Sequence, residues 1–371
     1  MLGTLLRNIF GVNSSPHAST TCRNQAKKQP AGTLGDWAAL AKPMPRGDIT
    51  VYDPKGVPLR LHCSDEVARG GEGIIYRFAR NNGVLIKVCR QETRDDKDKL
   101  SLFRRRMNAM MRLDECCQAD FLAWPLMPVM DNRGGAVGFV MRKCTGRTLR
   151  ALLAPVQVQR FFPGWTRLQV TQVALNFLDA VRMLAKHKVL INDFNPGNFL
   201  VDSKGIVRLI DCDSFQIPVE NGEPFITHTH TPEYTAPELL LHPELFNRPR
   251  TPEQIRFSLA VIIYMVLMSG LHPYARCGGG SPEENLRSGK CHLDKDSGVR
   301  MPVSWHKSVS WLTPGLRACF LRMFKDGFAN PARRPLLSEL RTELVHFIEV
   351  MKSSRSDNQR AILPTTAKRG Q

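Results

Sequence analysis

The sequence predicts an α+β protein built in two lobes, the first rich in strands and the second mainly helical. Residues 46–90 alternate short apolar runs with turn residues, which is typical of strands, and a further hairpin is expected over residues 121–141. One helix is expected between them, over residues 95–113. From Thr145 onward apolar residues recur mainly at helical spacing, so a cleft is expected between the two lobes.

The first lobe is expected to span about residues 59–141. Its helix carries apolar residues on one side, among them Leu100, Phe103 and Met107. A turn that begins at Asp131 joins the last two strands. The strands expected in and just before this lobe cover residues 49–52, 59–62, 73–78, 83–89, 121–130 and 136–141.

The second lobe is expected to span about residues 145–350. Its first long helix, over residues 166–188, repeats apolar residues at near-helical spacing. The longest apolar run of the chain, Leu259 to Met268, is too short to cross a membrane and is predicted to be a buried helix. The remaining helices are expected over residues 253–269, 314–326 and 336–351.

The chain of 371 residues carries a formal net charge of +18. Residues 1–45 and 351–371 hold a charge of +4 each and are predicted to be disordered basic segments around a folded part at 46–350. A basic surface can attract nucleic acid or acidic substrates. Because no compact run of five basic residues occurs, a merely basic surface is favoured over a nucleic-acid partner.

The ten cysteines lack the spacing of a disulfide framework or of a zinc site, which favours a reduced, cytoplasmic protein. Residues 1–45 contain no acidic residue before Asp36 and are rich in Ser, Thr and basic residues. Export or targeting to an organelle therefore stays an alternative. No transmembrane segment is expected.

Three polar residues that stand between apolar flanks, Asp193, Asn198 and Asp211, indicate a catalytic site. A hairpin is predicted over residues 199–210, so Asn198 and Asp211 would meet at one end of it. Mg²⁺ prefers oxygen ligands and takes few from protein when substrate phosphates supply the rest, so these two residues are predicted to hold a metal. Asp193 would remain available to accept a hydroxyl proton.

A second candidate site, for binding phosphate, lies in the first lobe and contains several glycines. Gly70, Gly71 and Gly73 lie between two predicted strands, where glycine lets the backbone approach phosphates and offer its N–H groups. An ordinary glycine-rich hairpin is the alternative. Lys87 ends the next apolar strand, where it would either extend to water or hold phosphates.

Taken in order, these residues resemble the motifs of eukaryotic-type protein kinases. Two later strings strengthen the resemblance, Thr231-Pro-Glu-Tyr-Thr-Ala-Pro-Glu238 and Asn330-Pro-Ala-Arg-Arg-Pro335. The resemblance implies a two-lobed protein-kinase-like fold that uses ATP with Mg²⁺ or Mn²⁺. It further implies that Lys87 and the three glycines bind the ATP phosphates, and that Glu238 and Arg334 form a buried ion pair.

The segment that joins the two lobes resembles the hinge of a kinase. By this resemblance Met141 would line the back of the adenine pocket, and backbone groups of Arg142, Lys143 and Cys144 would bind the edge of the adenine. An ordinary turn from strand to helix is the alternative.

Three strings are similar to those of the bacterial Ser/Thr kinases that often carry a helix-hairpin-helix part after the kinase domain: Ala123-Trp-Pro125, Ile191 to Asn198, and Leu209 to Gln216. Too few residues follow the kinase-like part here, so that nucleic-acid-binding part is expected to be absent. The resemblance also implies a partner phosphatase and a von Willebrand A-type partner.

Several positions depart from the kinase pattern. The usual His-Arg before the catalytic aspartate is Ile191-Asn192, so a phosphorylated activation loop would lack its matching cation. The usual lysine of this loop is Asn195, and the glycine of the D-F-G motif is Asp213. Ile255 stands where an aspartate is expected at the start of the long buried helix.

The carboxylate partner of Lys87 is also irregular, because Arg104-Arg-Arg106 stands where the kinase glutamate is expected. The candidates are Glu92, Asp95, Asp96 and Asp98, of which Asp95 and Asp98 are favoured.

The sequence therefore predicts a protein Ser/Thr kinase, an ATP-dependent phosphotransferase that acts on a protein substrate the sequence does not identify. A pseudokinase that binds nucleotide or a partner without transfer is the main alternative. A basic nucleic-acid-binding module is a third.

Overall fold

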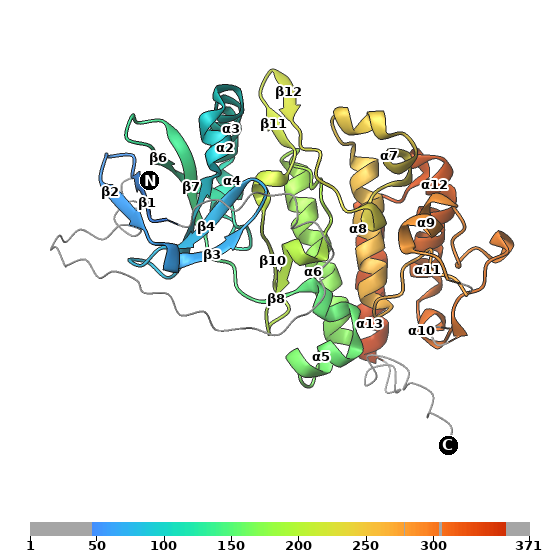
Figure 1. Cartoon of the computed structure of the whole chain (residues 1–371). Coiled ribbons are helices and arrows are strands. Elements are labelled where there is room, and N and C mark those ends of the chain that lie inside the picture. Colours follow the sequence, from blue (N-terminus) through green and yellow to red (C-terminus); the bar gives the residue numbers. More distant parts are fainter. Residues whose placement is uncertain (1–46, 278, 304–305, 354–371) are drawn as a thin grey trace. The chain divides into compact units, whose positions relative to one another are not determined.

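The computed structural model describes residues 47–277, 279–303 and 306–353. They divide into two units, one made of residues 47–97 and Pro128–Val140, the other of Asp98–Met127 and residues 141–353. Figure 1 shows mainly strands in the first unit and mainly helices in the second. The expected two-lobed α+β fold is confirmed. The predictions for residues 1–45 and for most of 351–371 lie outside the described residues.

A seven-stranded sheet dominates the first unit. The strand order is β2 (Pro58–Leu61), β1 (Ile49–Tyr52), β6 (Pro125–Met130), β7 (Ala136–Arg142), β5 (Val84–Cys89), β4 (Gly73–Arg77) and β3 (Glu66–Arg69). Two of the strands, β2 and β6, have buried residues at alternate positions, and β4, β5 and β7 are buried along most of their length. β3 was not expected, because its Val67 is 49% exposed and it therefore lacks a buried apolar alternation.

The helix expected over residues 95–113 is confirmed over Lys97–Met111, and a short helix that was not expected precedes it. A short helix, α2 (Gln91–Asp95), ends at Asp96, whose backbone is extended. α3 (Lys97–Met111) then follows, and its last turn is held by Trp124, whose indole N–H donates to the carbonyl of Met110 at 3.0 Å. α4 (Asp114–Gln118) comes next.

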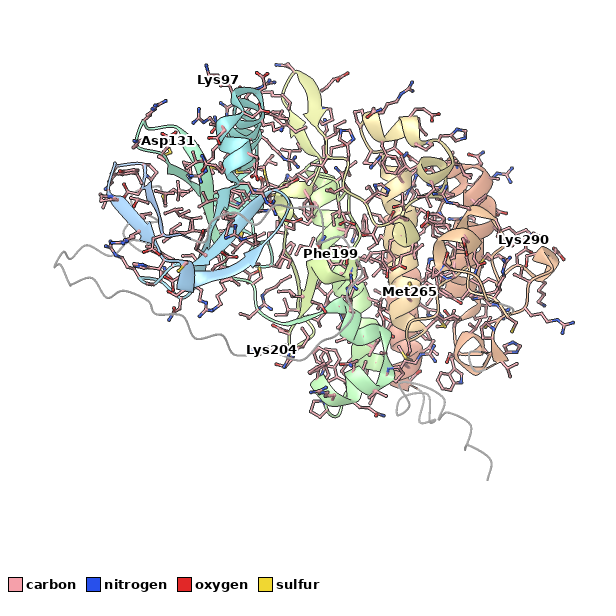
Figure 2. The ribbon with its side chains drawn as sticks, in the orientation of Figure 1. Lys97, Asp131, Phe199, Lys204, Met265 and Lys290 are labelled. Carbon is pink, nitrogen blue, oxygen red and sulfur yellow. The ribbon has the colours of Figure 1, made fainter. Side chains whose placement is uncertain are left out.

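Long helices form the core of the second unit, where α6 (Arg167–Lys186) packs against α8 (Pro252–Leu267) and α13 (Leu337–Ser353) (Figure 1). α6 and α8 each begin with a capping box. α8 carries apolar side chains on all of its faces, among them Met265, which Figure 2 labels, and a helix of that kind is buried on all sides. Among the helices of the described residues, none is both long and apolar enough to cross a membrane.

The shorter helices of the second unit are α5 (Pro155–Phe161), α7 (Pro237–Leu241), α9 (Pro282–Arg287), α10 (His306–Ser310), α11 (Pro314–Leu321) and α12 (Gly327–Ala329). A π-helical turn, Arg322–Asp326, continues α11, so the expected helix over residues 314–326 is present. α13 continues to Ser353, and the buried Met351, which is 3% exposed, holds its last turn against the core. The predicted disordered tail therefore begins too early by at least three residues.

Two small sheets complete the second unit. β8 (Arg147–Thr148), β9 (Phe199–Val201) and β10 (Val207–Leu209) form one, and β9 and β10 are the predicted hairpin. Phe199, which Figure 2 labels, packs on Phe177 of α6 with ring centroids 4.5 Å apart. The hairpin of β11 (Ile217–Val219) and β12 (Gly222–Phe225) was not expected.

An ion pair ties α7 to the loop before α13. Arg334 donates through Nη1 and Nη2 to the two carboxylate oxygens of Glu238, at 2.8 and 2.6 Å. The Arg334 side chain is fully buried, and its remaining donors bond the carbonyls of Gly327 and Glu253. A buried pair whose other hydrogen-bonding groups are satisfied chiefly matters because removing one member leaves the other charge buried.

A second buried polar group, His272, lies in the loop after α8. Its Nε2 bonds the carbonyl of Glu233 at 2.8 Å, and its Nδ1 accepts from the backbone N–H of Tyr274 at 3.2 Å. Burial lowers the pKa of His272 to about 4. A proton on Nδ1 would face the Tyr274 N–H, so the fold needs this histidine neutral.

The stability of the protein should therefore fall in acid. Because the folded pKa of His272 lies below the unfolded value of 6.5, its neutral form contributes full stability above about pH 6.5, and that contribution is lost as pH falls toward 4. The pH slope of the free energy of unfolding should be shallower in His272→Gln by up to about 1.4 kcal/mol per pH unit. Denaturant unfolding across this range measures it, with the exposed His346→Gln as the matched control. An unchanged slope in His272→Gln would contradict this assignment.

Candidate active site

The β9–β10 hairpin brings two of the predicted site residues to the same end. Phe199 pairs with Leu209, so Asn198 and Asp211 flank the hairpin at its open end. The backbone N–H of Ile210 donates to the carbonyl of Asn198 at 2.9 Å and closes this end. Local pairing of the strands thus places an amide and a carboxylate together, as the sequence predicts.

The turn from Asp193 to Asn198 is stabilised from within. Asn195 caps a 3₁₀ turn, η4 (Pro196–Asn198), because its Oδ1 accepts from the N–H of Gly197 at 2.9 Å. The Asn198 Nδ2 points to Oδ2 of Asp193 at a distance of 3.5 Å. With its nitrogen on this side, Asn198 keeps its oxygen available as a ligand. We name residues Asp193–Asn198 the catalytic turn.

Asp193 is also bonded by a residue from a distant segment. The Thr231 hydroxyl donates to Oδ1 of Asp193 at 2.6 Å. Burial raises the pKa of Asp193, the Thr231 hydrogen bond opposes that shift, and the negative charge of Asp211 adds to it. A carboxylate of raised pKa that is held in a fixed orientation is suited to accept a hydroxyl proton. The contact with Thr231 was not foreseen, although the sequence marked the string that Thr231 begins.

Asp211 has a backbone conformation that non-glycine residues seldom adopt, with φ +59° and ψ +37°. Such a conformation costs on the order of 1 kcal/mol and commonly occurs at functional sites. It is held by Ser214, whose N–H and hydroxyl both donate to the Asp211 carbonyl, at 3.0 and 2.8 Å. The exposed Asp211 and the Asn198 oxygen are hard oxygen donors, which fits Mg²⁺ or Mn²⁺ with phosphate oxygens completing the coordination.

A neutral hydrogen-bonded cluster connects the catalytic turn to the chain after Asp211. Asn192, which replaces the usual arginine, donates through Nδ2 to the Thr227 hydroxyl at 2.7 Å. That hydroxyl donates in turn to the carbonyl of Ser214 at 2.6 Å. All three residues are buried. Unlike an arginine that pairs with a phosphate, this cluster joins the segments without any charged group.

The other half of the predicted site lies in the first unit. Gly70, Gly71 and Gly73 form the turn between β3 and β4, where the Gly70 N–H donates to the Gly73 carbonyl at 2.9 Å. Gly73 cannot carry a side chain, because a Cβ there would lie 2.7 Å from the carbonyl oxygen of Val88. The turn is thus a tight hairpin in which Gly70 and Gly71 are exposed, and its role in binding phosphate stays a prediction.

Lys87 lies on β5 and is 7% exposed. Its Cγ and Cε lie 3.3 Å from the position that a Cβ of Gly73 would take, so its aliphatic stem runs beside the glycine turn. Among its candidate partners, Asp95 accepts from the side chain of Gln91 at 2.8 Å, and Asp98 lies in the first turn of α3. Which carboxylate pairs with Lys87 stays a prediction.

The residues that resemble a hinge follow β7 in the second unit. Met141 is 6% exposed, whereas Lys143 is exposed, and burial raises the pKa of the Cys144 thiol to about 11. The Arg142 side chain donates to the carbonyls of Cys117 and Ala119 at 2.7 and 3.1 Å. This leaves backbone groups, rather than the Arg142 guanidinium, as the predicted contacts to adenine.

Comparisons with known proteins point to one family. Residues 62–350 match the family model described as "Protein kinase domain". The chain is 29% identical over 213 residues to "Protein kinase YegI" of Escherichia coli strain K12, a match that covers 57% of this chain and 32% of that protein. It is 25% identical over 222 residues to "Calcium-dependent protein kinase 22" of Oryza sativa subsp. japonica, covering 57% and 33%. The chain spans about a third of the length of these curated relatives.

Removing the Thr227 hydroxyl should loosen the segment that follows Asp211. Thr227→Val leaves the Asn192 amide and the Ser214 carbonyl without their main partner, at a cost of about 1–3 kcal/mol. Hydrogen exchange followed by mass spectrometry should show faster exchange in peptides that cover residues 214–231. Thr50→Val removes an exposed hydroxyl of β1, far from the cluster in sequence, and is the matched control. Equal exchange in the two variants would contradict the role of the cluster.

Proposed function

The chain belongs to the protein kinase domain family, and we propose that it transfers the γ-phosphate of ATP to a serine or threonine hydroxyl of a protein substrate. The observation that carries the proposal is the position of Asp193. Its two carboxylate oxygens are engaged by Thr231 and Asn198, and the charge of Asp211 acts on it. A proton acceptor beside a pair of hard oxygen donors is the arrangement that phosphoryl transfer needs.

Each predicted residue has a role in this proposal. Asp193 orients the substrate hydroxyl and accepts its proton. Asn198 and Asp211 would hold Mg²⁺ or Mn²⁺, which when bound neutralises negative charge on the ATP phosphates. Lys87 and the glycine turn at residues 70–73 bind the phosphates. Positioning and charge stabilisation supply most of the rate enhancement in such a transfer.

The adenine site of the proposal consists of the buried Met141 and backbone groups of residues 142–144. Glu238 and Arg334 have a structural role, since their ion pair joins α7 to the last helical region. The folded kinase part is proposed to span residues 46–350, which includes the range that matches the family model.

The assignment to a subfamily of kinases rests on short stretches of sequence alone. We propose membership of the helix-hairpin-helix-associated bacterial kinases from the strings around Trp124, Asp193 and Asp211. A partner phosphatase and a cytoplasmic location stay predictions. The kinase relatives support protein kinase activity, and a pseudokinase that binds nucleotide without transfer is the less favoured alternative.

Phosphate transfer from labelled ATP–Mg²⁺ to a generic protein substrate tests the proposal. Asp193→Asn should lower the transfer rate by about two to four orders of magnitude, because the carboxylate that accepts the proton is lost. Stabilisation of the variant by ATP–Mg²⁺ in thermal unfolding should persist, since the phosphate-binding residues are intact. Asp296→Asn, at an exposed carboxylate, is the matched control.

Two outcomes would contradict the proposal. Equal transfer by Asp193→Asn and the wild type would remove Asp193 from the chemistry. Stabilisation of the wild type by ATP–Mg²⁺ without any transfer would favour the pseudokinase.

A further inference from the structure

Arg150 lies beside the catalytic turn, although it is 45 residues away in sequence. It belongs to a 3₁₀ helix, η3 (Leu149–Leu153), which lies between β8 and α5 in the chain (Figure 1). Its Nη2 donates to Oδ1 of Asn195 at 2.7 Å, the same oxygen that caps the catalytic turn. The guanidinium is thereby docked on a residue two positions from Asp193.

The Arg150 guanidinium lies close to the segments that hold Asp193, as Gly197 and Tyr234 indicate. A Cβ on Gly197 would lie 3.4 Å from Nε and 3.7 Å from Nη2 of Arg150, so the guanidinium lies against the bare backbone of the turn. Burial raises the pKa of the Tyr234 hydroxyl, and the positive charge of Arg150 opposes that shift. Tyr234 follows Thr231, whose hydroxyl bonds Asp193. Arg150 is thus near both segments that hold the proposed proton acceptor.

The charge of Arg150 is not neutralised by a neighbouring acidic side chain. Within the described ranges Arg150 forms no ion pair with Asp or Glu, and it is exposed. The sequence around Arg150 also lacks negative charge, because residues 142–178 contain no acidic residue. The basic residues in this stretch are Arg142, Lys143, Arg147, Arg150, Arg160 and Arg167.

We propose that Arg150 binds an anionic side chain of the protein substrate, so that the enzyme prefers a hydroxyl with an acidic or phosphorylated residue a few positions away. The proposal rests on the proposed kinase function, in which the acceptor hydroxyl lies at Asp193. Because Arg150 is docked two residues further along the turn, a substrate residue near the acceptor can reach it. A guanidinium suits either anion, since its planar donors match both carboxylate and phosphate.

A set of short peptides with a single serine tests the specificity. At each position from three residues before to three residues after the serine, taken in turn, the residue is Ala, Glu, phosphothreonine or Arg, and kcat and KM are measured for each peptide. The wild type should show a lower KM for the Glu or phosphothreonine peptide than for the Ala peptide. The relative order of those two peptides distinguishes a carboxylate from a phosphate as the preferred group.

Variants of Arg150 assign the preference to this side chain. Arg150→Ala should reduce the ratio of kcat/KM for the anionic peptide over the Ala peptide by about three- to five-fold, as expected for an exposed ion pair. Arg150→Glu should reverse the order and favour the Arg peptide, whereas Arg150→Lys should retain most of the preference. Arg160→Ala, at an exposed arginine of α5, is the matched control and should leave the ratio unchanged. Thermal unfolding of each variant verifies that it is folded.

The experiments distinguish failure of the specificity proposal from failure of the proposed kinase function. If the wild type phosphorylates the peptides without regard to charge, or Arg150→Ala leaves the ratio unchanged, the specificity proposal is wrong and the kinase function stands. If Arg150→Ala lowers kcat equally for every peptide, Arg150 acts through the catalytic turn or on the transferring phosphate, and the specificity proposal is again wrong. If the wild type transfers phosphate to no peptide and to no generic protein, the kinase function and the specificity proposal fail together.

Discussion

The hydrogen bond from Thr231 to Asp193 is the interaction on which the second unit's half of the site depends. It joins the catalytic turn to the segment that leads into α7, and it fixes the orientation of the carboxylate. α7 is in turn anchored by the bidentate pair of Glu238 and Arg334. A series of short, specific contacts thus runs from the buried core of the second unit to the proposed proton acceptor.

Near Asp193, neutral side chains occupy two positions that carry basic residues in the usual kinase pattern. At the position of the usual arginine, Asn192 binds the Thr227 hydroxyl, and at the position of the usual lysine, Asn195 caps its own turn. The positive charge close to this turn comes instead from Arg150. The cluster of Asn192, Thr227 and Ser214 needs no phosphate to form, because each of its hydrogen bonds joins two neutral groups. Orientation of the proposed acceptor is therefore expected to be independent of phosphorylation in the segment after Asp211.

The sequence could predict those parts of the fold and the site that depend on residues close together in the chain. The hairpin that carries Asn198 and Asp211 and the strand that carries Lys87 follow from apolar runs between turn residues. β3 was missed because Val67 faces solvent. The contacts of Asn192 with Thr227 and of Arg150 with Asn195 could not be predicted, since they join residues 35 and 45 positions apart and depend on how the helical unit folds. Positive φ at Asp211 likewise depends on Ser214 and the end of the hairpin.

Thr231 and Asn198, which bond the Asp193 carboxylate, are both neutral, so Asp193 should be ready for transfer without any phosphate on the enzyme. The time course of phosphate transfer tests this, with protein that was produced together with a phosphatase and shown by intact mass to carry no phosphate. Such protein should transfer phosphate to a protein substrate at a constant rate from the first turnovers. A lag that shortens as the enzyme concentration rises would show that the molecules must first phosphorylate one another, and that the contacts of Asp193 do not suffice for transfer.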